Sequence, residues 1–134
     1  MKLVLDTNIV LDLWVFGEQA VAPLRDFLAA GKANWFCTAA MRDELACVLR
    51  YEQIGARMAA AKVLPQEVLE AFDRHATLVD TPPPALFKCR DPDDQKFVDL
   101  AVARAATLLS KDKALLALRR KIAVASSFSA PLPG

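Results

Sequence analysis

The chain has 134 residues, enough for one domain with one hydrophobic core, and 54% of them are hydrophobic, which excludes an intrinsically disordered protein. Seventeen basic and sixteen acidic side chains leave a formal net charge of +1, so the total charge indicates no strong long-range attraction to nucleic acid. No apolar run approaches the roughly 18 residues of a membrane span, and the first residues lack a signal-peptide pattern, so we expect a cytoplasmic protein.

Short apolar runs alternate with segments of helical periodicity along the whole chain. We predict strands at residues 3–5, 35–37, 77–79, 107–110 and 122–124. We predict helices at about 8–16, 20–30, 39–51, 52–62, 65–75, 91–106 and 113–119, followed by a C-terminal tail at 126–134. This alternation is typical of an α/β domain with a parallel sheet, and right-handed crossovers would place helices on both faces. We therefore expect residues 1–134 to form one α/β domain.

The three cysteines, Cys37, Cys47 and Cys89, are odd in number and lack C-x-x-C spacing. This pattern argues against a disulfide framework and against a zinc site. We expect all three to be reduced residues of the core.

Two aspartates follow predicted strands. Asp6 comes directly after the apolar run 3–5, and Asp112 comes two residues after the run that ends at Ser110. In an open parallel sheet, ligands bind just beyond the carboxyl ends of the strands, so both carboxylates are candidates for a binding site. Other roles are open from the residues alone. Asp6 can cap the next helix, as Thr7 or Asn8 also can, and Asp112 can form an ordinary turn with Ser110.

Glu44 falls within the apolar arc of its predicted helix. On a helical wheel, Met41, Leu45, Cys47 and Val48 lie on that arc, whereas the other charged residues of the helix lie opposite. An unpaired charge is costly in such a place, so either a cation meets Glu44 or its neighbours leave it a path to water. The alternative to a functional role is a buried salt bridge with an arginine.

The segment Asp91-Pro92-Asp93-Asp94 begins a predicted helix, where the helix dipole favours acidic side chains. Capping accounts for Asp91 and Asp93. Asp94 differs because it shares a helix face with Phe97, Val98 and Ala101, and therefore points along the buried side. Asp99 lies on the far face of the same helix, and we expect it to be solvated.

Four acidic residues, Asp6, Glu44, Asp94 and Asp112, thus stand at strand ends or on inward helix faces. Hard oxygen ligands without a cysteine or histidine cluster favour Mg²⁺ or Mn²⁺ over zinc. Two such ions about 4 Å apart can activate water and stabilise an in-line displacement at phosphorus. The pattern therefore predicts phosphodiester hydrolysis. It requires that folding bring all four carboxylates into one basin that no lysine or arginine fills.

Several segments in order resemble the PIN-domain ribonucleases, in particular the branch of VapC-like toxins. These are Leu5-Asp6-Thr7-Asn8, Asp43-Glu44-Leu45, Asp91-Pro92-Asp93-Asp94 leading to Phe97 through Ala101, and Leu109-Ser110-Lys111-Asp112. The resemblance implies a three-layer α/β/α sandwich around a five-stranded parallel sheet, and Mg²⁺- or Mn²⁺-dependent endonuclease action on RNA. It further implies a homodimer, silenced by an antitoxin protein that inserts a segment into the acidic groove.

The resemblance also assigns roles to residues. It implies that the four acidic residues are catalytic and hold the metal, with Asn8, Ser110 and Asp91 as supporting polar residues. Asp94 matches the family better than Asp91 because it precedes Ala101 by the usual interval. Candidates for contact with RNA phosphates are Lys88, Arg90, Lys111, Lys113 and the run 119–121, although such a run can also be a solvated helix end.

Two other functions share part of this pattern. A phosphatase that forms an aspartyl phosphate would need a second aspartate two residues after Asp6, and Asn8 stands there. The alternative that remains is a catalytically inactive PIN-like module that binds RNA or a partner protein.

Overall fold

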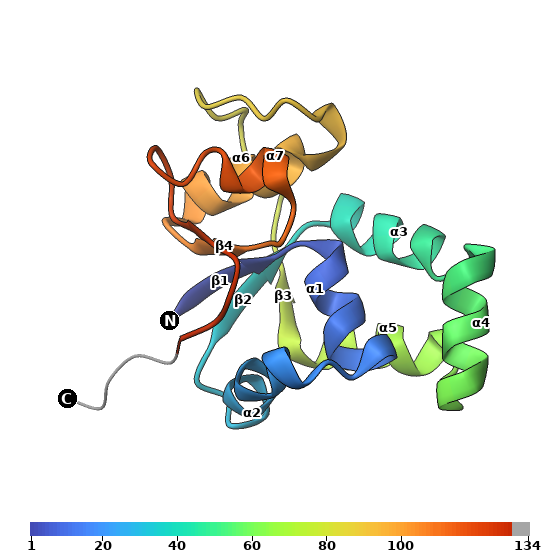
Figure 1. Cartoon of the computed structure of the whole chain (residues 1–134). Helices are drawn as coiled ribbons and strands as arrows, with labels where there is room; N and C mark the ends of the chain where they lie inside the picture. Colours follow the sequence, from blue (N-terminus) through green and yellow to red (C-terminus); the bar gives the residue numbers. More distant parts are fainter. Residues whose placement is uncertain (130–134) are drawn as a thin grey trace.

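A computed structural model describes residues 1–129 and shows a five-stranded, wholly parallel sheet in the order β3-β2-β1-β4-β5 (Figure 1). The strands are β1 (Lys2–Leu5), β2 (Asn34–Cys37), β3 (Ala76–Leu78), β4 (Thr107–Leu109) and β5 (Val124–Ala125). Figure 1 shows α1, α3 and α5 on one side of the sheet and α6 and α7 on the other. The predicted α/β/α sandwich is confirmed.

The helices fall close to the predicted ranges. They are α1 (Thr7–Leu11), η1 (Asp12–Phe16), η2 (Gln19–Val21), α2 (Ala22–Ala29), α3 (Ala39–Val48), α4 (Glu52–Ala61), α5 (Pro65–His75), η3 (Pro92–Asp94), α6 (Gln95–Arg104) and α7 (Lys113–Leu116). Helix α5 has the predicted bounds, because Pro65 suits a first turn, where its missing N–H is not needed.

The first predicted helix is divided into two parts. It begins as the α-helix α1 and continues as the π-helical turn η1, which ends at Gly17 in a left-handed conformation (φ 60°). Neither Thr7 nor Asn8 is its cap. Asp6 holds the cap position, but its side chain does not cap the helix.

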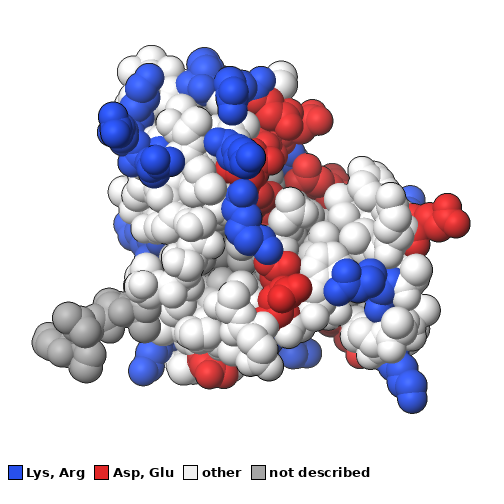
Figure 2. Space-filling view, in the orientation of Figure 1, with Lys and Arg blue, Asp and Glu red and all other residues white. Residues whose placement is uncertain are grey.

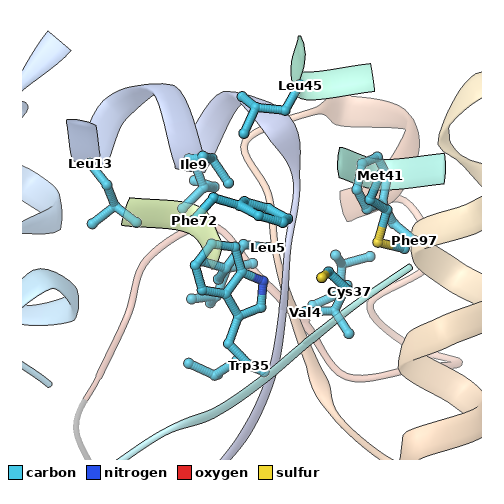
Figure 3. Close-up of a cluster of buried hydrophobic side chains, with 14 of the residues drawn as sticks. Val4, Leu5, Ile9, Leu13, Trp35, Cys37, Met41, Leu45, Phe72 and Phe97 are labelled. Carbon is cyan, nitrogen blue, oxygen red and sulfur yellow. The ribbon is translucent and has the colours of Figure 1, made fainter. Parts of the chain in front are cut away.

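The hydrophobic core lies along the central strand β1, whose residues Leu3 and Val4 are fully buried. Trp35 of β2 packs edge-on against Phe72 of α5, with ring centroids 4.9 Å apart (Figure 3). Full burial of such a side chain contributes roughly 1.5–3 kcal/mol. Packing of this kind fixes how the helices sit on the sheet, and thereby fixes where the strand ends point.

The C-terminal segment differs from its prediction in two respects. The fifth strand starts at Val124 rather than at residue 122, because pairing with β4 sets its register (Leu108 with Val124, Leu109 with Ala125). The expected tail at 126–134 is not a bare tail over its described part. Phe128 packs against Phe27 of α2, with ring centroids 5.0 Å apart, whereas residues 130–134 lie outside the described residues.

Two further findings concern exposure. Cys37 is buried and Cys89 is half-buried, but Cys47 is exposed on α3, so the prediction that all three cysteines belong to the core was wrong for Cys47. The apolar arc of α3 is narrower than the wheel indicated, because α3 packs on α1 and α5 through Met41 and Leu45.

Within residues 1–129, no helix is both long enough and apolar enough to pass through a membrane.

The strand order creates a switch point between β1 and β4. The chain builds outward from β1 through β2 to β3 and then crosses back to place β4 on the other side of β1. At such a point the crossover connections leave the sheet in opposite directions, which opens a crevice at the carboxyl ends of the strands. Asp6 and Ser110 follow the two strands that flank this point.

Candidate active site

Asp6 lies at the base of the crevice, where its side chain is held by β4. The residue is only 4% exposed, and its carboxylate oxygen Oδ2 accepts a hydrogen bond of 2.7 Å from the Ser110 hydroxyl. Its backbone amide donates to the carbonyl oxygen of Leu109, at 3.0 Å, which extends the pairing of β1 and β4 by one residue. Asp6 is therefore positioned by the sheet itself.

Asp112 is positioned by the same serine. Its backbone amide donates to Ser110 Oγ at 3.0 Å, and its carboxylate oxygen Oδ1 accepts from the Ala114 amide at 2.7 Å, capping α7. The turn with Ser110 that sequence reasoning left open is present, and Asp112 also caps α7, which was not predicted. They bring Asp112 next to Asp6, because Ser110 links both residues.

Glu44 reaches the crevice from α3. Its Oε2 accepts a hydrogen bond of 2.6 Å from the Thr7 hydroxyl, and its Oε1 lies 3.1 Å from Lys96 Nζ. The Glu44 side chain is 28% exposed, so it keeps a path to water as well as a cation. The salt bridge that sequence reasoning held open thus exists, but with a half-buried lysine of α6 rather than with an arginine.

Asp94 stands where η3 meets α6, close enough to Asp6 to be affected by its charge. Its Oδ2 is buried and has no hydrogen-bond partner among the described residues. Burial raises the pKa of Asp94 to about 7, and the negative charges of Asp6, Asp112, Asp91 and Glu44 add to that effect. A buried carboxylate oxygen without a partner needs either a proton or a cation.

The pKa of Asp6 is raised in the same way. Burial is the largest cause, and the charges of Asp112 and Glu44 contribute, while the Ser110 hydroxyl and the nearby Asn8 amide lower the pKa. The four predicted acidic residues are thus close enough to act on one another. Figure 2 shows acidic side chains gathered between the surface formed by α6 and α7 and the surface around α3, with lysines and arginines on the α6–α7 side.

The carboxylates do not converge on a single point. Within residues 1–129, no three acidic, histidine or cysteine side chains are close enough to enclose a metal ion as they stand. Binding of an ion would therefore require side chains of the cluster to rotate. The donors fit a hard divalent cation in chemistry, because they are all carboxylate oxygens and Oδ2 of Asp94 has no other partner in the described part of the chain.

The supporting residues occupy different positions. Ser110 is fully buried and contacts Asp6, whereas Asn8 is exposed on the first turn of α1. Asp91 caps η3 by accepting a hydrogen bond of 3.0 Å from the Asp93 amide, as expected for a helix start, and its charge also acts on Asp94.

The predicted basic residues are all exposed, but the run 119–121 lies away from the crevice, at the amino-terminal edge of the sheet, where Lys121 lines a pocket with Ala106 and Ala123. Lys88 and Arg90 precede η3, Lys111 and Lys113 flank Asp112, and the run 119–121 follows α7. Lys111 is already engaged, because its Nζ lies 2.5 Å from Oδ2 of the buried Asp12. The ammonium of Lys111 therefore fixes the loop after β4 against the start of η1.

Sequence reasoning missed three residues that hold the acidic cluster in place: Thr7, Asp12 and Lys96. A signal existed for a cation near Glu44, because an acidic residue on an apolar arc requires one. The partner could not be named, since Lys96 lies 52 residues from Glu44 along the chain.

Asp99 was expected to be solvated, and this was wrong. It accepts a hydrogen bond of 2.8 Å from the Ala85 amide and fixes the loop before η3.

A comparison with protein families gives a match over most of the chain. The model of the PIN domain family matches residues 2–114. The chain belongs to the PIN domain family. The matched range includes the four acidic residues and Ser110. PIN domains are generally nucleases and generally use divalent metals, which agrees with the carboxylate chemistry of the crevice.

A solved structure shares the fold of this PIN domain. The crystal structure of VapBC2 from Rickettsia felis bound to a DNA fragment from their promoter contains a chain that superposes with a TM-score of 0.66. The two chains are 15% identical, and the match covers 93% of this chain and 98% of the other. At this identity the likeness shows a shared fold. A search of curated proteins found no match.

Proposed function

We propose that this PIN domain is a metal-dependent endoribonuclease that hydrolyses RNA phosphodiester bonds. The observation that carries the proposal is the acidic cluster at the switch point, in which Asp94 has a buried carboxylate oxygen without a partner in residues 1–129. Membership of a family of nucleases supports hydrolysis of a nucleic acid. The whole chain, 1–134, would act as one nuclease domain.

The cation in this proposal is Mg²⁺ or Mn²⁺, bound within the acidic cluster that Asp6, Glu44, Asp94 and Asp112 form. Such an ion, when bound, lowers the pKa of a water molecule and stabilises negative charge that develops at phosphorus. Ser110 fixes the Asp6 carboxylate at the base of the crevice by its hydrogen bond to Oδ2. The Ala114 amide orients Asp112 in the same way. Because these contacts already exist, little reorganisation of the backbone is needed at the moment of reaction.

The side chains around the crevice would position the substrate. Lys88, Arg90 and Lys113 are exposed beside the acidic cluster, and lysines and arginines line the α6–α7 side in Figure 2. Cations so placed can bind backbone phosphates without reading the bases. Lys111 would contribute less, because its ammonium is paired with Asp12. Asn8 and Asp91 would support the site from its margin.

We further propose that the protein is the toxin of a toxin–antitoxin pair, with a cognate antitoxin as partner and a homodimer as its assembly. The basis is the shared fold with a chain of the VapBC2 complex. A cytoplasmic location belongs to this proposal, since RNA is the substrate and all three cysteines are free.

One observation favours a second function, that of an inactive PIN-like module that binds RNA or a partner protein. Within residues 1–129, no three metal-binding side chains converge on one point, and a lysine already neutralises Glu44. A module of this kind would keep the fold and the basic margin and would not need a metal.

Cleavage of structured RNA by the purified full-length protein, in Mg²⁺, in Mn²⁺ and in a chelator, separates the two functions. We expect metal-dependent cleavage, and we expect Asp6→Asn to reduce it by roughly 100-fold or more, because several kcal/mol of charge stabilisation depend on the metal. Asp26→Asn, an exposed aspartate of α2, is the matched control and should cleave normally. Equal cleavage by wild type and Asp6→Asn would indicate a contaminating nuclease. Binding of RNA without cleavage in any metal would establish the inactive module.

A further inference from the structure

Lys96 pairs directly with a member of the acidic cluster, Glu44, and its ammonium group is fixed in place. It lies in the first turn of α6, two residues after Asp94, with Nζ 3.1 Å from Glu44 Oε1. The same nitrogen donates a hydrogen bond to the carbonyl oxygen of Asp93 and lies 5.1 Å from the ring centroid of Phe97. The Lys96 side chain is only 26% exposed. Three contacts therefore keep this positive charge at one position.

Glu44 is fully engaged as a result. Its Oε1 faces Lys96, and its Oε2 accepts the hydrogen bond of 2.6 Å from Thr7. Asp94 has the opposite property, because its Oδ2 is buried and has no partner among the described residues. The cluster thus has two halves. One half is neutralised by the protein itself, and the other half, made by Asp6, Asp94 and Asp112, is not.

We propose that Lys96 is a positioning residue that takes the place of a second metal ion, so that the cluster binds one divalent cation, at Asp6, Asp94 and Asp112. This inference rests on the proposed function and specifies its metal stoichiometry. Two-metal nuclease sites hold their ions about 3.5–4 Å apart on shared carboxylates. Glu44 is the carboxylate left to hold a second ion, and the fixed ammonium occupies its free side.

Distance and charge both oppose a second ion next to Lys96. Mg²⁺ binds an oxygen at about 2.0–2.1 Å, so an ion on Glu44 Oε1 would lie close to an ammonium that is 3.1 Å from the same oxygen. Two cations at such a separation repel strongly in a partly buried site. Charge balance agrees with a single ion. Four carboxylates alone would need two divalent ions for neutrality, whereas four carboxylates together with the Lys96 ammonium are nearly neutralised by one divalent ion.

Counting bound Mn²⁺ tests the inference without any measurement of cleavage. Equilibrium dialysis and electron paramagnetic resonance on the full-length protein should give one Mn²⁺ per chain at saturation. Lys96→Met keeps the aliphatic stem and removes the charge, and it should bind a second, weaker Mn²⁺, seen also as spin–spin broadening. Lys96→Arg keeps a cation and should bind one ion. Lys32→Met, an exposed lysine between α2 and β2, is the matched control and should bind one ion.

The double variant Lys96→Met/Glu44→Gln should return to one ion, because the second ion in Lys96→Met depends on Glu44. Thermal unfolding without metal checks that each variant folds, and Lys96→Gln replaces Lys96→Met if that variant does not. Two Mn²⁺ in the wild type, or one in the neutral Lys96 variant, would overturn the inference and leave the proposed nuclease intact. No Mn²⁺ in the wild type would overturn both.

Discussion

Ser110 donates a hydrogen bond of 2.7 Å to Asp6 Oδ2, joining two residues that are 104 positions apart in the chain. The bond crosses the switch point between β1 and β4, and both residues are almost completely buried. Ser110 also accepts a hydrogen bond from the Asp112 amide, so one hydroxyl group sets the positions of two carboxylates. This residue follows a strand and supplies no charge, yet the base of the acidic cluster depends on it.

Replacement of Ser110 by alanine should destabilise the fold and weaken the site. The variant leaves a buried carboxylate oxygen of Asp6 without a donor. This should lower the free energy of unfolding, measured in urea, by about 1–3 kcal/mol. Because the Ser110 hydroxyl lowers the pKa of Asp6, its loss should raise that pKa and shift the pH dependence of cleavage upward. Ser127→Ala, an exposed serine after β5, is the control. A stable Ser110→Ala with an unchanged pH profile would contradict this role.

The stability of the metal-free protein should fall as pH rises from about 4 to about 7. The pKa of Asp94 is raised from 3.8 to about 7 in the folded protein, mainly by burial. In that window the folded state holds a proton that the unfolded state has released, so deprotonation favours unfolding. The stability that depends on protonated Asp94 is fully present below pH 4 and is lost above pH 7. Asp6 shifts in the same direction.

Asp94→Asn should remove this loss of stability between pH 4 and pH 7. In a chelator at pH 8, the variant should be more stable than the wild type by roughly 1–2 kcal/mol, less than the full pKa shift implies because Asp94 is partly solvated. Below about pH 4 the two should unfold alike, and Asp26→Asn should follow the wild type at both pH values. Mg²⁺ should stabilise the wild type at pH 8 more than it stabilises Asp94→Asn. An equal loss of stability between pH 5 and pH 8 in both proteins would exclude Asp94 as the cause.

Asp99 and Gln95 should control the order of the proline-rich connection between β3 and η3. Asp99 Oδ1 accepts hydrogen bonds from the Ala85 amide at 2.8 Å and from Gln95 Nε2 at 2.9 Å. Gln95 in turn accepts from the Cys89 amide at 2.7 Å. Asp99→Ala should cost about 1–3 kcal/mol, since it removes the acceptor of a half-buried amide.

Hydrogen exchange measures this effect locally. In Asp99→Ala, exchange should quicken around Ala85, and protease cleavage of the connection should increase. Asp80→Ala removes an exposed carboxylate at the start of the same connection and should leave both unchanged. If Asp99→Ala exchanged like the wild type, the connection would be held by its prolines alone.

Local sequence determined the elements and the edge of the sheet at which the acidic residues lie. The run Leu3 to Leu5 reads as a buried strand from its own composition, and Pro65 marks the start of α5 without reference to any other residue. Parallel strands share one carboxyl edge, so an aspartate that follows a strand is placed at that edge by topology alone. For this reason Asp6 and Asp112 could be assigned to one crevice before their contacts were known.

Tertiary structure alone decided the partners of those acidic residues. That Lys96, and not an arginine, meets Glu44 depends on how α3 and α6, on opposite sides of the sheet, reach the same crevice. That Asp99 holds a loop depends on where the connection after β3 folds back. Hydrophobic periodicity states which face of a helix is buried, but not which side chain of a distant element lies opposite. Those contacts arise from the packing of whole helices on the sheet, which sums many small contributions from residues far apart in the chain.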